Sequence, residues 1–217
     1  MKGLLIKDFR LMKGQKTFFL AIVAISILTA VTSSNTLFAI SFLGFVCPMF
    51  VLSSISYDEF DNGNAFLFSL PITRKGYVFE KYIFGLILSI AALIFSTAVC
   101  LIISVIKNTV SINEIFITAL TVFPAELLIL SLMLPFQLKF GAEKGRIAII
   151  AVLGGVSVIG VLLAKAAEAM NINLYELLNA VSKLGMQTFF LLYLLISFII
   201  LIISCRISIK VINKKEF

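Results

Sequence analysis

Six long apolar runs alternate with short polar segments along the chain. The runs lie near residues 17–34, 37–56, 82–106, 115–138, 147–164 and 187–205. A helix needs about 20 apolar residues, in a range of roughly 17–25, to cross the hydrocarbon of a bilayer. All six runs reach this length, so the pattern predicts six transmembrane helices in an all-α integral membrane protein. No small-residue cleavage site follows the first run, which we therefore expect to be an uncleaved span.

The basic N-terminal segment, residues 1–16, predicts a further helix outside the spans. Leu5, Phe9 and Met12 recur at i, i+4 and i+7, which places them on one helical face, while the bases project elsewhere. This arrangement fits a helix that lies in the membrane interface with its bases toward anionic headgroups. It fits equally an ordinary basic flank that fixes the topology.

The segment before the last run, residues 165–186, is longer than the other outer segments and only partly polar. Leu174, Leu177, Leu178 and Val181 recur at i, i+3, i+4 and i+7. This stripe predicts a short outer helix that lies on, or dips into, the outer face of the membrane. An outer gate and a plain surface helix explain the stripe equally well.

Composition agrees with the apolar pattern. The 217 residues are 61% apolar and 13% charged, whereas soluble chains average about 45–50% and about 25%. A soluble core of this size cannot hide so much apolar surface, so we expect a single transmembrane domain over residues 1–217.

The positions of the bases predict the orientation. With the N-terminus inside, the inner segments hold fifteen of the eighteen Lys and Arg residues, and the outer segments keep only Lys107, Lys165 and Lys183. Because Lys and Arg concentrate in cytoplasmic loops, we expect a multi-pass plasma-membrane protein with both termini in the cytoplasm.

The longest inner segment, residues 57–81, is called the central loop below. It holds four of the eleven acids and three bases: Asp58, Glu59, Asp61, Glu80, Arg74, Lys75 and Lys81. Together with Phe66, Phe68 and Leu70, these charges suit docking against a soluble protein better than solvation alone. The first three carboxylates can bind a cation, but they also suit a solvated helix end, which is the favoured interpretation.

Glu126 is the ionisable residue that the pattern places deepest in a span. It lies about eleven residues from the outer end of the fourth run, between Pro124 and Pro135, which remove backbone donors and favour kinks. An ionisable group at this depth is costly and is by default a functional candidate. We therefore consider a place on a substrate path and, alternatively, a neutral hydrogen-bonded side chain that serves packing.

Residues for catalysis or metal binding are scarce. The chain has no His, and its three cysteines, Cys47, Cys100 and Cys205, lie in apolar runs without metal-ligand spacing. The segment Gly14-Gln15-Lys16-Thr17 lacks the adjacent Gly-Lys pair of a phosphate-binding loop. We expect no enzyme activity, no metal and no cofactor on this chain, and no interaction with nucleic acid.

The central loop resembles that of a known family, the membrane subunits of bacterial type-2 ATP-binding cassette exporters. The shared features, in order, are Asp58-Glu59 at the end of the second run, Gly63, the apolar stretch 65–68, Ser69-Leu70-Pro71, Arg74-Lys75 and Lys81-Tyr82. The basic N-terminal helix, six spans and inner termini also match the family's layout.

The resemblance implies a coupling helix that docks on a separate cytosolic ATPase, which would bind the ATP and Mg²⁺. The docking helix would comprise Ala65, Phe66, Leu67, Phe68, Ser69 and Leu70, and Pro71 would end it. Glu59, at the membrane edge, would pair with Arg74, Lys75 or Lys81. The resemblance also implies a second permease chain, identical or different.

The short loops are similar to those of exporters of phenol-soluble modulins and other antimicrobial peptides, so the resemblance implies amphipathic peptides or other hydrophobic compounds as cargo. The alternative function is a gradient-driven carrier or the vitamin-binding membrane subunit of an importer. A carrier more often shows several buried charges or broken helices at the midplane, whereas this sequence offers Glu126 alone.

Overall fold

The computed structural model describes residues 2–32, 36–60, 63–108, 110–169 and 185–215, and for most of 142–169 it describes the backbone alone. This part of the chain is helical and contains no strand. Its helices are α1 (Lys2–Gly14), α2 (Lys16–Thr32), α3 (Phe38–Val46), α4 (Phe50–Glu59), α5 (Gly63–Ser69), α6 (Arg74–Lys107), α7 (Ile112–Ala169) and α9 (Met186–Lys214). The all-α prediction is therefore confirmed for the described residues.

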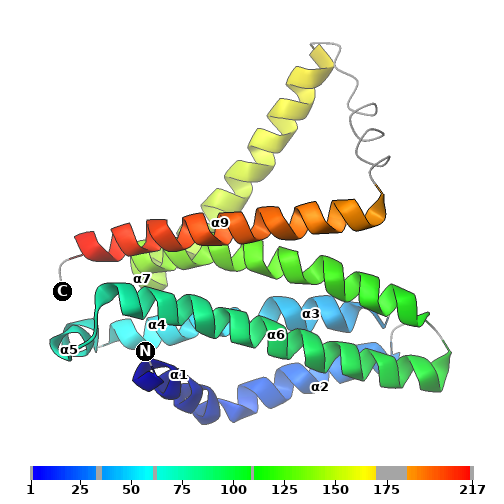
Figure 1. Ribbon diagram of the computed structural model, residues 1–217, viewed down its shortest axis with the longest axis horizontal. Coiled ribbons are helices and arrows are strands. Elements are labelled where there is room, and N and C mark those ends of the chain that lie inside the picture. The colour runs from blue at the N-terminus through cyan, green and yellow to red at the C-terminus, as the bar shows by residue number, and fades with distance from the viewer. Residues whose placement is uncertain (1, 33–35, 61–62, 109, 170–184, 216–217) are drawn as a thin grey trace.

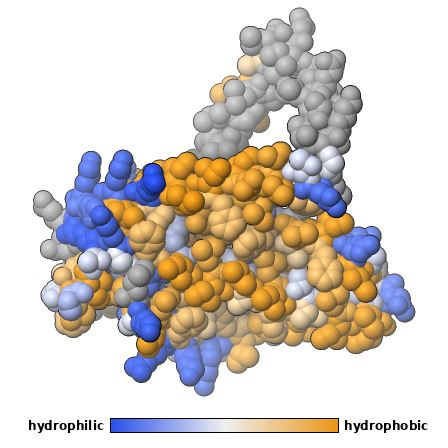
Figure 2. All heavy atoms as spheres, in the orientation of Figure 1, coloured by the Kyte–Doolittle hydropathy of each residue, from blue (hydrophilic) through white to orange (hydrophobic). Residues whose placement is uncertain are grey.

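The long helices run side by side along the length of the molecule (Figure 1). Both chain ends and the short helix α5 lie at the same end of this bundle, which we call the α5 end. Figure 2 shows a broad apolar band along the side of the bundle, with hydrophilic side chains gathered at its two ends and most densely at the α5 end. This distribution matches a bilayer, whose hydrocarbon faces the band and whose interfaces face the ends.

Four helical segments of the described chain are long and apolar enough to cross a membrane: Phe38–Glu59, Arg74–Lys107, Ile112–Gly141 and Gln187–Lys214. A fifth is added if α1 and α2, which are bent by 68° at their junction, count as one span. The backbone of residues 147–164 is helical within α7, and the outer stripe 174–181 lies outside the described residues. The multi-pass membrane class is thus confirmed, and the sixth span stays a prediction.

The sharp break in α7 falls at a glycine. Gly141 has φ 76° and ψ −176°, a conformation that side chains with a Cβ rarely adopt. Pro124 and Pro135 lie within the helix before this break. Beyond Gly141 the helix leaves the bundle at a steep angle (Figure 1), so the predicted inner segment between the fourth and fifth runs becomes one sharp turn.

The largest apolar core among the described residues joins five helices to α5, which contributes Leu67. It includes Leu4 of α1, Phe50 of α4, Phe84 of α6, Leu134 of α7 and Ile212 of α9. The ring of Phe84 lies 6.3 Å from that of Phe50 in an edge-to-face arrangement, a favoured geometry for aromatic pairs. This packing brings the ends of all five helices together around the polar residues described below.

Helices α6 and α9 are also joined by hydroxyl groups. The Tyr82 hydroxyl lies 2.6 Å from Ser204 Oγ and 2.9 Å from Ser208 Oγ, and all three residues are buried. In hydrocarbon these groups have no water to bind, so the contacts fix the rotation of α9 against α6.

We predict that Tyr82→Phe lowers the free energy of unfolding by about 1 kcal/mol, since interhelical hydrogen bonds in membranes contribute roughly 0.6–2 kcal/mol. Unfolding in mixed micelles with increasing dodecyl sulfate measures the change. The control Tyr193→Phe removes the hydroxyl of a half-buried ring that stacks on Phe189, and it should change stability by less than about 0.5 kcal/mol. Equal losses in the two variants would contradict the role of the Tyr82 hydroxyl.

Candidate functional site

A buried ammonium group, that of Lys81, lies at the centre of the candidate site. Its Nζ atom is 2.6 Å from Asp8 Oδ2, 2.8 Å from Asp58 Oδ2 and 2.6 Å from Ser54 Oγ. Lys81 and Asp8 are fully buried and Asp58 is 7% exposed. Three helices thereby meet at one cation, because Asp8 belongs to α1, Ser54 and Asp58 to α4, and Lys81 to α6.

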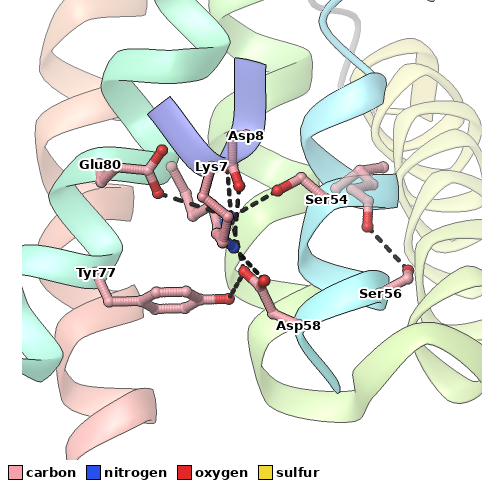
Figure 3. Close-up of polar contacts among 9 residues, drawn as sticks. Lys7, Asp8, Ser54, Ser56, Asp58, Tyr77 and Glu80 are labelled. Atoms are coloured by element: carbon pink, nitrogen blue, oxygen red, sulfur yellow. Dashed lines mark hydrogen bonds and ion pairs between the residues drawn. The ribbon is translucent and has the colours of Figure 1, made fainter. Parts of the chain in front are cut away.

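Three more polar side chains complete this group, which we call the Lys81 cluster (Figure 3). Lys7 pairs with Asp58 and lies 3.0 Å from Asp8. The Tyr77 hydroxyl donates to Asp58 Oδ2 at 3.1 Å, and Glu80 Oε2 lies 3.7 Å from the Lys81 ammonium. Asp58, the last but one residue of α4, therefore receives contacts from α1 and from two turns of α6.

Asp8 is held in its charged form. Burial alone would raise the pKa of its carboxyl, but the Lys81 ammonium and the hydrogen bonds from Lys81 and Ser54 outweigh burial and hold the pKa below its ordinary value of 3.8. The stabilisation from this shift is therefore complete above the unfolded-state pKa of about 3.9. It is lost as the pH falls through the folded-state pKa, so α1 stays attached throughout the neutral range.

A second group of contacts surrounds the end of α9. Arg74, the first residue of α6, donates from Nη1 to the carbonyl oxygens of Ile212, Asn213 and Lys215 at 2.8–3.0 Å. The last carbonyls of a helix have no partner within the helix, and a guanidinium satisfies several of them at once. The start of α6 is thereby fastened to the end of α9.

Glu59, the last residue of α4, joins the same region. Its Oε1 atom accepts a hydrogen bond from Lys215 Nζ at 3.0 Å, and Lys215 also donates to the carbonyl of Leu138 at 3.2 Å. A Cβ added at Gly141 would lie 3.1 Å from Glu59 Oε2. The break in α7 and the end of α9 therefore both pack against the carboxylate that precedes α5.

Helix α5 projects from between these two groups of contacts. Its first residue, Gly63, sits so close to Asp58 that an added Cβ would lie 2.8 Å from the Asp58 carbonyl oxygen. Leu67 is buried in the core, and Phe68 packs on Tyr77 with ring centroids 5.5 Å apart. The exposed residues of α5 and of the segment up to Lys75 are Ala65, Phe66, Ser69, Leu70, Pro71, Thr73 and Lys75. The apolar side chains of Phe66 and Leu70 are 70% and 44% exposed, although they lie at a hydrophilic end of the bundle.

Glu126 belongs to α7 and lies far from these contacts, with its side chain buried. It fills space beside Gly44 of α3, where an added Cβ would overlap its carboxyl oxygen and come within 3.0 Å of Val122. Ser89 of α6 approaches the same carboxyl group. The side chain thus occupies a gap between three helices, which favours the packing interpretation over an open substrate path.

Some predicted features are brought together and others are not. Asp58 and Lys81 meet directly, Glu59 takes Lys215 as a partner that the sequence did not single out, and Asp61 lies outside the described residues. No group of three or more His, Cys, Asp or Glu side chains within the described chain is arranged to hold a metal ion. The cysteines are free and buried, as packing residues are.

Sequence reasoning missed Asp8, Ser54, Tyr77 and the role of Glu80. One available signal was Asp8 itself, the single acid among the bases of residues 1–16. It stands one helical turn after Leu4, the other buried residue of α1, and an acid on a buried face requires a cation nearby.

The fold and the site define a multi-pass helical membrane protein with a small helix exposed beside buried ion pairs. The chain matches the family model of ABC-2 family transporter proteins over residues 3–213. Because the match covers almost the entire chain, the protein belongs to the ABC-2 transporter family. Membership implies a place in a membrane as a transporter permease and a partner ATPase. No curated protein and no solved structure matches the chain.

We predict that Lys81→Met destabilises the protein by about 3–5 kcal/mol, because it removes the buried cation between Asp8 and Asp58 and leaves them the partly exposed Lys7 ammonium alone. Thermal unfolding in detergent measures the loss. Lys75→Met, at an exposed position of the same helix, is the control and should change stability by less than about 0.5 kcal/mol. Adding Asp8→Asn and Asp58→Asn to Lys81→Met should restore part of the stability, and no recovery would contradict the charge argument.

We also predict that Gly44→Ala destabilises the protein and that Glu126→Ala reduces this effect, because removal of the carboxyl opens the space that the new methyl group needs. A double-mutant cycle of unfolding free energies should give a coupling of about 0.5–3 kcal/mol, as for residues in contact. If the two changes have additive effects on the unfolding free energy, Glu126 does not occupy the space beside Gly44.

Proposed function

We propose that this chain is the permease subunit of an ATP-driven exporter, and that α5 is the helix on which the cytosolic ATPase docks. The observation that carries the proposal is the exposed apolar pair of Phe66 on α5 and Leu70 directly after it, in a segment flanked by the Glu59–Lys215 pair and by the buried Lys81–Asp8 pair. Exposed apolar side chains at a hydrophilic end mark an interaction surface rather than a solvated turn. Lys75 and Pro71 border this surface.

The contacts around α5 also provide a route for movement. On its N-terminal side, Asp58 and Glu59 connect it to α1, α6, α7 and the end of α9. On its C-terminal side, Arg74 binds the end of α9 and Lys81 binds α1 and α4. A displacement of α5 by a partner would therefore move the inner ends of several spans together, since packed interfaces shift as units rather than deform continuously.

Six spans with cytoplasmic termini fit this assembly. Lys215 binds the Leu138 carbonyl, so α7 reaches Gly141 next to the end of α9. Helix α9 has 29 residues and is about 43 Å long at 1.5 Å per residue, which places its start at the opposite end of the bundle. This arrangement is compatible with the fifth span predicted near residues 147–164, and the basic residues at the α5 end favour the cytoplasmic side of the plasma membrane.

The remaining parts of the proposal concern molecules outside this chain. ATP hydrolysis, with its Mg²⁺, belongs to the ATPase subunit, and a second permease chain completes the transporter. The cargo we propose is an amphipathic peptide or another hydrophobic antimicrobial compound, which a surface rich in the chain's 21 Phe residues would contact favourably.

We predict that Leu70→Asp abolishes recovery of the ATPase with the tagged permease while the permease itself stays folded, because a charge then lies in the apolar docking surface. The measurement is affinity purification from the native membrane in mild detergent, with partners identified by mass spectrometry. The control Ile112→Asp places the same charge at a 57% exposed position at the opposite end of the bundle and should retain the ATPase. Full retention by Leu70→Asp would contradict docking through α5.

A further inference from the structure

An open groove runs between α7 and α9 on the side of the bundle. Its volume is about 630 Å³, within the range of roughly 300–1,000 Å³ typical of ligand sites. The walls are apolar and consist mainly of Leu128, Leu132 and Phe136 from α7 and Ile200, Ile207 and Val211 from α9. Ile200 and Ile207 are 39% and 48% exposed, so the groove opens toward whatever surrounds the bundle.

A missing backbone donor shapes the floor of the groove. Pro135 has no N–H group, so the carbonyl of Ser131, four residues earlier, loses its partner within the helix. The hydroxyl of Ser204 donates to this carbonyl from α9. The small serine side chains let the helices approach at this point, while the larger apolar side chains on either side leave the groove open above them.

Two lysines lie toward the α5 end of the helices that form the groove, Lys139 as part of its lining and Lys214 three residues after the lining residue Val211. Lys139 lines the groove and follows Leu128 by 11 residues, close to three full helical turns. Lys214 follows Ile200 by 14 residues, close to four turns, so it falls on the same stripe of α9, and it is exposed. The neighbouring contacts of Lys215 with Leu138 and Glu59 place both lysines at the level of the polar site, where headgroups lie.

We propose that this groove is a binding site for an anionic phospholipid, with an acyl chain along the apolar walls and the phosphate between Lys139 and Lys214. Basic pockets between transmembrane helices at the cytoplasmic side suit acidic headgroups. Charge complementarity selects this occupant over a second copy of the chain. A second copy would carry the same net charge of +7. If two copies packed through this groove, Lys139 and Lys214 of one copy would lie near the same lysines of the other and repel them.

The test is native mass spectrometry of the purified full-length chain, titrated with phosphatidylglycerol or with phosphatidylcholine of identical acyl chains. The wild type should bind phosphatidylglycerol more tightly. Lys139→Gln and Lys214→Gln should each weaken that binding about fivefold and together about 25-fold, since each surface cation contributes a comparable factor to anionic lipid binding. Ile207→Trp, which fills the groove, should weaken the binding of both lipids.

Arg206→Gln is the matched control, because Arg206 is exposed at the same end of α9 but turned about 100° from Ile207; its lipid binding should equal that of the wild type. The double variant Lys139→Arg, Lys214→Arg keeps both charges and should bind phosphatidylglycerol as the wild type does. It shows whether the Gln variants lose binding through the missing charge or through any change at these two positions. Equal affinity for the two lipids, an equal loss in Arg206→Gln, or a second chain or peptide that Ile207→Trp displaces while both lipids still bind would overturn the proposal.

Discussion

The α5 end of this protein depends on the burial of one ammonium group, that of Lys81. Lys81 has no exposed surface, and an unpaired cation in such a place would cost several kcal/mol. The charge is tolerable only while Asp8 and Asp58 both remain beside it. Helix α1 must therefore lie against the spans, α4 must end where it does, and α6 must start close to both. A single electrostatic requirement thus fixes three segments that are far apart in the sequence.

The exposed helix α5 gains its position from this requirement and from the contacts at the end of α9. Asp58 and Glu59 precede α5, and Arg74 and Lys81 follow it, so the chain on both sides of the helix is tied to α1 and to the end of α9. Such an element cannot move alone. For an ABC-2 transporter, whose energy comes from a partner, a surface helix that is firmly connected to several spans is a suitable point for force to enter.

Much of this organisation could be predicted from the sequence, because the length of each apolar run and the positions of Lys and Arg between the runs can be read without knowing which residues meet in the fold. The apolar runs gave the helical class, and the charge-rich segment between the second and third runs gave the position of α5. The partners of its charges could not be predicted, since Asp8 and Lys215 lie 73 and 156 residues from Lys81 and Glu59. Likewise, the polar interruption between residues 138 and 147 predicted a segment between two spans, but not that the chain would turn there in one break at Gly141, which depends on one positive φ angle.

Hydrogen–deuterium exchange of the wild type and of Lys81→Met in lipid nanodiscs tests the central claim most directly. If Lys81 fastens the three segments as one unit, the variant should lose protection together in α1, in the last turns of α4 with α5, and in the first turns of α6. The end of α6 and the start of α7 that lie opposite α5 should keep their exchange rates, because they are remote from the Lys81 cluster. Faster exchange confined to the residues around position 81, with α1 and α5 unchanged, would contradict the account.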